Sequence, residues 1–174
     1  MSDDARPIRV AYADPPYVGC GKLYPERAEV DHSVLVARLA ADYPDGWALS
    51  CHSPSLRELL PLCPADVRVM AWVKPFVIFR PGNGRAYAWE PVLLRGGRSP
   101  SRYEPTVRDW VAAAAPTRRG IRGAKPAAFA YWLFSVLGLR PGDQFDDLYP
   151  GTGAVTAAWD HFERQGRLRL VRRA

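Results

Sequence analysis

The sequence lacks the features that mark a membrane protein, a disulfide-bonded scaffold or a zinc site. No apolar run reaches 18 residues, so we expect no membrane-spanning helix. Residues 1–4 are polar and acidic, without the apolar stretch of a secretory signal. The three cysteines, Cys20, Cys51 and Cys63, are odd in number and irregularly spaced, which predicts neither a disulfide framework nor a zinc site. We therefore expect a cytoplasmic protein, and 174 residues fit one domain.

The most informative local pattern is Asp14-Pro15-Pro16-Tyr17, which follows a β-branched and aromatic run at residues 7–13. This run predicts a buried strand, and ligands of open α/β sheets bind at the carboxyl ends of strands. The prolines fix φ and cannot donate hydrogen bonds, so the turn is stiff and offers the Asp14 carboxylate and the Pro15 carbonyl as acceptors. Such a turn suits the exocyclic amino group of a planar base that stacks on Tyr17. In a chain with 17 prolines it is also compatible with an ordinary strand-ending turn.

A second pattern lies near the C-terminus. Residues 144–148 predict a short strand that ends in the acid Asp147, and the turn Gly151-Thr152-Gly153 leads into a predicted helix at 154–164. Glycines allow a backbone to approach a ligand closely, as in nucleotide-binding turns. A Gly-x-Gly turn alone is a common loop, but the acidic strand end and the following Tyr149 make this pattern more specific.

Two further segments complete an ordered set of landmarks. Residues 67–75 end in Trp-x-Lys, and residues 86–94 carry an embedded glutamate. In this order the motifs resemble the β group of amino-methyltransferases, which modify adenine or cytosine in nucleic acid and include many phage and restriction-associated adenine-N6 methylases. The resemblance covers most of residues 8–160. It implies an α/β, Rossmann-like methyltransferase fold with a mixed, mostly parallel sheet, in permuted order with the catalytic motif first and the cofactor loop last.

The resemblance also implies which residues form the site. Asp14, Pro15, Pro16 and Tyr17 correspond to the catalytic motif, which would act on a base that has left the helix stack. The cofactor would be S-adenosylmethionine (SAM), transfer would be direct, and no metal would be needed. Asp147 would face the methionine part of the cofactor. The cofactor-binding set implied by the resemblance is Asp147, Tyr149, Gly151, Thr152, Gly153, Lys125, Pro126 and Phe129.

The chain departs from the family pattern after the helix at 154–164. In the family, the next strand ends in an acid that binds the ribose hydroxyls. Here the alternating residues 167–171 predict an edge strand without an acid. We therefore expect a fold that is truncated on the cofactor side. Three alternatives follow: other groups hold the ribose, a partner subunit completes the site, or the protein binds the cofactor weakly. The partner that we expect beside nucleic acid is either a second copy in a homodimer or such a completing subunit.

Basic residues are unevenly distributed in a chain of net charge +6. The segment 96–123 is rich in arginine, glycine and proline, which predicts a loop whose Arg118, Arg119 and Arg122 contact phosphates. A solvated basic loop is the alternative. The loop at 18–31 follows the catalytic motif and is a natural lid or base-contacting segment, through Lys22 and Tyr24.

The whole chain, 1–174, is thus expected to form one domain without a separate target-recognition domain. A catalytic half (1–95), the basic loop segment (96–123) and a cofactor-binding half (124–174) follow one another. Between the landmarks we predict a helix at 32–43 with Asp31 as its N-cap and a second helix at 53–62. We also predict strands at 47–51, 67–73 and 86–94. His52 precedes the second helix, where it is either a base near the site or a structural histidine.

The function that these patterns favour is SAM-dependent methylation of adenine N6 in DNA. Methylation of RNA, of cytosine N4 or of a free nucleoside stays open. A catalytically weak nucleic-acid-binding or regulatory homologue is the alternative from another class.

Overall fold

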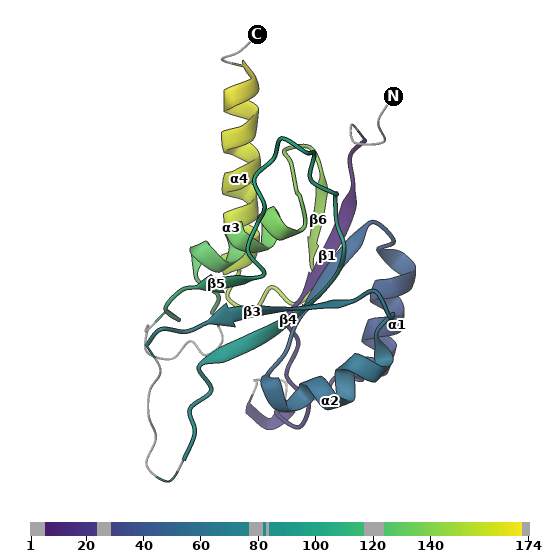
Figure 1. The fold of residues 1–174 in the computed structure, drawn as a ribbon, viewed down its shortest axis with the longest axis vertical. Helices are drawn as coiled ribbons and strands as arrows, with labels where there is room; N and C mark the ends of the chain where they lie inside the picture. Colours follow the sequence, from purple (N-terminus) through teal and green to yellow (C-terminus); the bar gives the residue numbers. More distant parts are fainter. Residues whose placement is uncertain (1–5, 24–28, 77–81, 83, 117–123, 172–174) are drawn as a thin grey trace.

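In the computed structural model, which describes residues 6–23, 29–76, 82, 84–116 and 124–171, a six-stranded sheet lies between two layers of helices (Figure 1). The strands are β1 (Arg9–Ala13), β2 (Gly46–Ser50), β3 (Arg68–Val73), β4 (Trp89–Gly96), β5 (Trp110–Ala112) and β6 (Gln144–Asp147). The helices are α1 (His32–Asp42), α2 (Leu56–Leu59), α3 (Ala127–Val136) and α4 (Ala154–Val171), with 3-10 turns η2 (Gly21–Leu23), η3 (Ser53–Ser55) and η4 (Leu60–Leu62).

The strand order of the sheet is β5-β3-β4-β2-β1-β6. β1 is parallel to β2 and β6, and β3 is parallel to β5, whereas β4 is antiparallel to both of its neighbours. Five strands therefore end, and β4 begins, at one edge of the sheet, which we call the carboxyl edge. Residues that follow β1, β2, β3 and β6 meet the first residues of β4 there.

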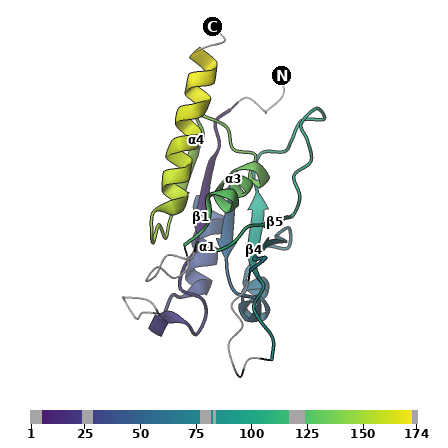
Figure 2. The same ribbon diagram turned by 90° about the vertical axis from the view of Figure 1, so that its left-hand side faces the viewer.

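The alternation of side chains along β1 divides the core into two layers. Val10 and Tyr12 belong to a cluster with α3 and α4, and Ala11 and Ala13 belong to a cluster with α1. Figures 1 and 2 show α4 beside the sheet, with its C-terminal end rising past the strands at the end of the molecule where β1 begins. α1 begins at the predicted N-cap Asp31, whose carboxylate accepts backbone N–H bonds from Ser33 and Val34.

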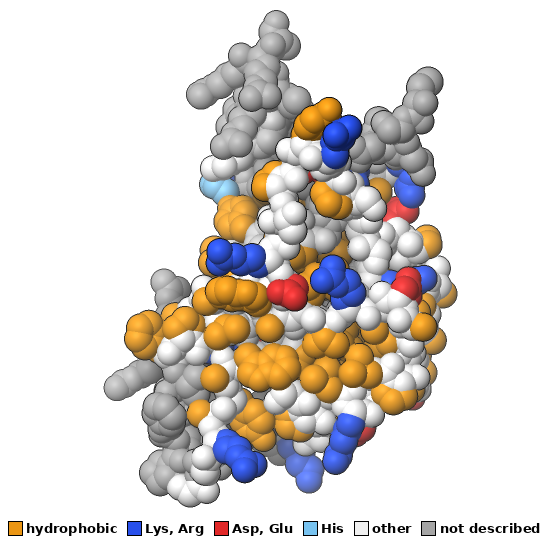
Figure 3. Space-filling view, in the orientation of Figure 1, with side chains coloured by type: hydrophobic (Ala, Val, Ile, Leu, Met, Phe, Trp, Pro, Cys, Tyr) orange, Lys and Arg blue, Asp and Glu red, His pale blue; other side chains and the backbone are white. Residues whose placement is uncertain are grey.

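The surface in the view of Figure 1 is not uniformly polar. Hydrophobic side chains form a band across the middle of this face, over β3, β4 and β5, with basic side chains above and below it (Figure 3). Val69, Val107 and Trp110 are among the exposed large hydrophobic residues. Acidic side chains are few in this view.

Most predicted elements are confirmed, and the sheet is mixed as expected. The predicted strands correspond to β1, β2, β3, β4 and β6, and β3 pairs with β4 in antiparallel orientation. The predicted helix at 53–62 is helical along its whole length, as η3, α2 and η4 in direct succession, although only α2 is α-helical. Pro61 has no backbone N–H with which to extend α2.

The predicted edge strand at 167–171 is a helix, because α4 continues to Val171. Five alternating residues are too few to distinguish the periodicity of a strand from that of a helix. Arginine and leucine are also good helix formers. The acid-free strand does not exist, and β6 is the last strand on that side within the described residues. Within those same ranges, no helix is both long and apolar enough to cross a membrane.

A second correction concerns the segment 96–123, which we predicted to be loop. Three of its residues form β5, which pairs with β3 in parallel through the register Trp72↔Val111. The indole N–H of Trp132 on α3 donates to the backbone carbonyl of Arg108 at 2.9 Å, which helps to hold the segment against the body. A three-residue strand is too short to produce a periodic signal in the sequence.

Candidate active site

Asp14 leaves β1 at the carboxyl edge and meets a buried lysine. The ammonium of Lys125 lies 2.8 Å from Oδ2 and 2.9 Å from Oδ1 of Asp14. Only 3% of the Lys125 side chain is exposed, and it enters the site from the turn before α3. A buried ammonium is costly unless it is paired and hydrogen-bonded, so this contact fixes the Asp14 carboxylate.

Glu90 at the start of β4 completes a buried charged cluster. Its Oε2 accepts from Tyr17 at 2.9 Å and from Lys125 at 3.2 Å, and its Oε1 forms an ion pair with Lys74. Lys74 follows β3, so three strands (β1, β3 and β4) and the turn before α3 contribute to the site. We call Asp14, Tyr17, Lys74, Glu90 and Lys125 the charged cluster. The formal charges of its two carboxylates and two ammonium groups cancel.

The charges in the cluster stabilise one another. Burial raises the pKa of Asp14, although Lys125 opposes the change. Burial also acts to raise the pKa of Glu90, but Lys125 and Lys74 outweigh it and hold that pKa below its ordinary value. Burial acts to lower the pKa of Lys125, but Asp14 and Glu90 outweigh it, so that pKa is raised. Lys125 is therefore firmly cationic at neutral pH.

The ring of Tyr17 is already stacked on one face. The imidazole of His52 lies parallel to it, with ring centroids 5.3 Å apart and planes inclined by 7°. Nδ1 of His52 lies 2.6 Å from Oγ of the buried residue Ser55. Burial of the His52 imidazole lowers its pKa. His52 thus lies at the site with its ring against Tyr17, and Nζ of Lys125 lies 6.0 Å from the centroid of the same Tyr17 ring.

The cofactor-like motif lies on the strand next to β1. Tyr12 pairs with Asp147 across the parallel β1–β6 ladder, and the N–H of Leu148 donates to the carbonyl of Tyr12 at 2.9 Å. The end of β6 therefore lies beside the end of β1. The two motifs lie side by side because the strands that precede them pair in the sheet.

The glycine turn has an open, left-handed backbone. Gly151 has φ +48° and Gly153 has φ +72°, and the N–H of Gly153 donates to the carbonyl of Pro150 at 2.6 Å. A Cβ at Gly153 would meet no heavy atom within 4 Å, so the space beside the turn is free of protein. Thr152 at its centre is exposed.

Asp147 has one oxygen without a protein partner. Thr156 donates to Oδ2 at 2.8 Å, whereas Oδ1 is buried and accepts no hydrogen bond within the described part of the chain. Burial raises the pKa of this carboxyl. An unsatisfied buried acceptor beside an open glycine turn fits a ligand that supplies a hydrogen-bond donor, such as the amino group of SAM.

The other predicted cofactor residues fall in different surroundings. Lys125 contacts Asp14 rather than the glycine turn, and Phe129 is fully buried against Tyr12 and Trp72. The carbonyl of Pro126 accepts the N–H of Phe129 at the start of α3. Tyr149 packs partly buried against the α1-side core.

Of the predicted nucleic-acid contacts, only Lys22 is described, and it is exposed in η2. Tyr24, Arg118, Arg119 and Arg122 lie outside the described residues. Sequence reasoning did not assign Glu90 or Lys74 to the site. The Trp-x-Lys ending and the embedded glutamate were signals that could have placed them there.

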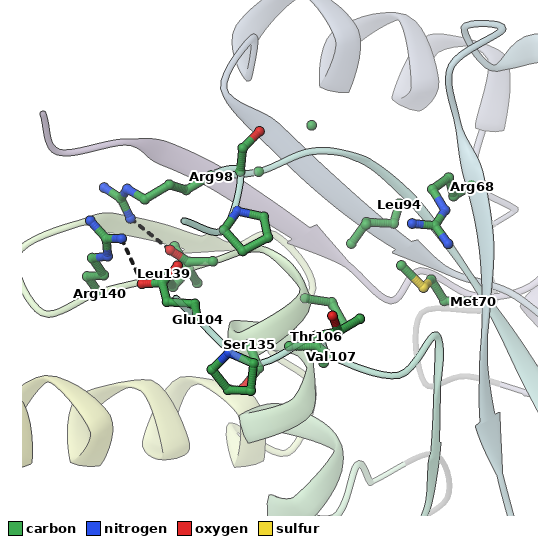
Figure 4. A pocket seen from close by; sticks show the side chains of 17 residues that line it. Arg68, Met70, Leu94, Arg98, Glu104, Thr106, Val107, Ser135, Leu139 and Arg140 are labelled. Carbon is green, nitrogen blue, oxygen red and sulfur yellow. Dashed lines mark hydrogen bonds and ion pairs between the residues drawn. The ribbon is translucent and has the colours of Figure 1, made fainter. Parts of the chain in front are cut away.

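A cavity of about 470 Å³ lies at the opposite edge of the sheet (Figure 4). Arg68, Leu94, Arg98 and Arg140 line it, and Arg140 forms an ion pair with Glu104 at 3.0 Å across its mouth. None of the predicted site residues lines it, so we place the candidate active site at the carboxyl edge.

The fold is an α/β fold with a mixed six-stranded sheet, and solved structures share it. The chain is similar to M1.HpyAVI in complex with SAM, with a TM-score of 0.65 and 18% identity over 90% of this chain and 80% of that one. It is also similar to M1.HpyAVI in a second structure, with a TM-score of 0.58 and 15% identity over 90% of this chain and 77% of that one. No protein-family model matches the chain, and no curated protein matches it in sequence.

Proposed function

We propose that this chain is a SAM-dependent DNA adenine-N6 methyltransferase of the permuted β group, formed by a single domain. The observation that carries the proposal is the meeting of the Asp14-Pro15-Pro16-Tyr17 turn and the Asp147 glycine turn at the ends of two neighbouring strands. A methyl acceptor and a methyl donor must lie side by side for direct transfer. The similarity to M1.HpyAVI in complex with SAM supports the choice of donor.

The charged cluster supplies the positioning that this reaction needs. A base that stacks on Tyr17 would direct its exocyclic amine to Asp14 and to the carbonyl of Pro15. An ionised carboxylate has about four acceptor positions, so Asp14 can accept from the amine as well as from Lys125. Because Lys125 and Glu90 fix the orientation of Asp14 and Tyr17, little reorganisation accompanies transfer.

The bound cofactor would supply an electrophilic methyl group. The amine nitrogen would accept this methyl group with the cofactor sulfur as leaving group, and Asp14 or solvent would take the proton that the amine loses. Asp147 and the turn around Gly151 and Gly153 would hold the donor with Oδ1 of Asp147 as an acceptor. The basic residues Lys22, Arg118, Arg119 and Arg122 are proposed phosphate contacts, and a homodimer or a completing partner subunit remains part of the proposal.

One observation favours a second candidate function. The ammonium of Lys125 already donates to both oxygens of Asp14, which is where the substrate amine would bind. This occupancy is what a nucleic-acid-binding homologue with weak or no catalysis would show. Methyl transfer must be measured to separate the two functions.

The test is transfer of labelled methyl groups from SAM to duplex DNA, single-stranded DNA, RNA and free nucleosides. Mass spectrometry of the digested product separates N6-methyladenine from N4-methylcytosine. Asp14→Ala should lower the rate by about a hundredfold or more, because one preorganised partner of the amine is lost. Its affinity for SAM, measured by calorimetry, should stay near the parent's, because Asp147 and the glycine turn are intact. Near-normal turnover in Asp14→Ala would contradict the proposal.

A further inference from the structure

The connection between β3 and β4 carries exposed aromatic side chains beside the charged cluster. We call its described residues, 74–76, 82 and 84–88, the arm. In Figure 1 its residues that lead into β4 extend away from the sheet at the lower left. The arm begins at Lys74 and ends two residues before Glu90, and these two side chains form an ion pair. The root of the arm is therefore part of the candidate active site.

The aromatic residues of the arm are unusually exposed for their size. Phe76 is 84% exposed and Tyr87 is 60% exposed, and Trp89, the first residue of β4, is 38% exposed. The N–H of Ala88 donates to the carbonyl of Ala86 at 3.1 Å, which forms a three-residue turn with Tyr87 at its centre. The Lys74 N–H donates to the Ala88 carbonyl at 2.8 Å, so backbone pairing continues past the strand ends and holds the root of the arm in place.

The charges of the arm favour an anionic partner. Lys74 and Arg85 are basic, Arg85 is exposed, and the described residues of the arm include no acid. A second copy of this chain carries the same net charge of +6, so long-range electrostatics oppose its docking on this surface. Aromatic rings interleaved with basic residues are the composition of surfaces that bind single-stranded nucleic acid.

We propose that the arm binds the nucleotides next to the target base, by stacking unpaired bases on Phe76 and Tyr87 while Arg85 contacts phosphate. The inference rests on the proposed function, because a base that enters the site leaves its neighbours without stacking partners. Aromatic rings at the root of the site replace part of the lost stacking. The arm thereby favours substrates that are single-stranded or easily opened around the target.

The test measures binding of a fluorescent single-stranded oligonucleotide, and of its duplex, by anisotropy. Phe76→Ala/Tyr87→Ala should weaken binding to the single strand by about tenfold or more, with SAM affinity unchanged. Phe76→Leu/Tyr87→Leu keeps apolar bulk but removes the flat rings, and it should bind as weakly. Arg85→Gln should lower the salt slope of binding by about one unit.

The matched control is Tyr103→Ala. Tyr103 is 86% exposed and has an arginine, Arg102, beside its ring, but it lies next to Glu104 at the opposite edge of the sheet. It should bind the oligonucleotide as the parent does. The inference would be overturned if either double variant bound the oligonucleotide as tightly as the parent. For the leucine variant, this result would show that flat rings are unnecessary.

Methyl transfer in the same samples separates the two proposals. Suppose that the parent methylates DNA and that a double variant has the parent's KM and affinity for the oligonucleotide. This result would overturn the role of the arm and leave the proposed function intact. A parent that binds the oligonucleotide through the arm without transferring methyl groups would overturn the proposed catalysis and support the arm. A parent with no affinity for nucleic acid would overturn both.

Discussion

Replacing Lys125 by methionine tests the charged cluster most directly. Lys125→Met keeps an unbranched side chain of similar length but removes the ammonium that pairs with Asp14 and Glu90. Both carboxylates then remain at a buried site with only Lys74, on Glu90, to balance them. Removing one partner of a buried ion pair costs about 3–5 kcal/mol, a large part of the usual 5–15 kcal/mol of folding stability.

The expected result is a large loss of stability that depends on pH. For a chain of this size, about 3–5 kcal/mol corresponds to a decrease in Tm of roughly 10 °C. Burial already raises the pKa of Asp14, and removal of Lys125 raises it further. A carboxyl whose folded pKa lies above its unfolded pKa destabilises the protein when ionised, and protonation relieves this cost. The stability gap between parent and variant should therefore narrow as the pH falls from 7 to 5.

In the parent, Glu90 and Lys125 should contribute no pH dependence of stability between pH 5 and pH 8. The pKa of Glu90 is lowered, so its stabilising contribution is present above its unfolded pKa and is lost as the pH falls through the folded pKa. The pKa of Lys125 is raised, so its contribution is full below its unfolded pKa and is lost at high pH, as the pH rises through the folded pKa. Both losses lie outside the range from pH 5 to pH 8, so urea unfolding of both proteins in that range isolates the pH dependence that the variant gains at Asp14.

A double variant distinguishes loss of the ion pair from general disruption of the fold. Lys125→Met with Asp14→Asn removes one charge of each sign and should recover about half of the lost stability, since the carboxylate that lost its ammonium is gone. The reasoning is refuted if Lys125→Met stays within about 1 kcal/mol of the parent at pH 7, or if its deficit is unchanged at pH 5.

Two further predictions concern the glycine turn and the ring behind Tyr17. Gly153→Val should abolish SAM binding measured by calorimetry, because a β-branched residue at φ +72° distorts the turn. The control is Gly142→Val, which places the same residue at φ +98° in another turn with open space around it. This control should lose stability but still bind SAM. Equal SAM binding by both variants would show that the turn at Gly153 is not the cofactor site. His52→Ala should raise KM for nucleic acid severalfold with a smaller change in kcat, and His52→Phe should restore KM because a flat ring again backs Tyr17. Steady-state kinetics of both histidine variants decides between ring stacking and proton transfer, since only the latter is lost in His52→Phe.

The fold was largely predictable because most of its elements carry local signals. β1 is a β-branched and aromatic run, α1 begins at an Asx cap, and the glycine turn opens α4. The two failures occurred where local signals are weak. β5 is three residues long, and the alternation at 167–171 lies within α4.

The charged cluster was less predictable, because its members meet only through the sheet. Asp14 and Tyr17 are neighbours in sequence, but Glu90 and Lys74 join them through the antiparallel β3–β4 pair, and Lys125 enters from the turn before α3. A family resemblance could mark each segment, but it could not show that Lys125 pairs with Asp14. That pairing follows from the burial of opposite charges at one point, which a linear sequence does not display.

The topology of the sheet explains why the candidate active site lies at the end of β1. The chain leaves β1 through α1 to reach β2 on one side, and it returns much later through α3 to place β6 on the other side. Connections that depart from a central strand in opposite directions leave a crevice at its carboxyl end. Asp14 occupies that position, with His52 after β2 on one flank and Asp147 on the other. The two halves of the proposed reaction can therefore meet although most of the chain separates them, because β1 pairs with both β2 and β6.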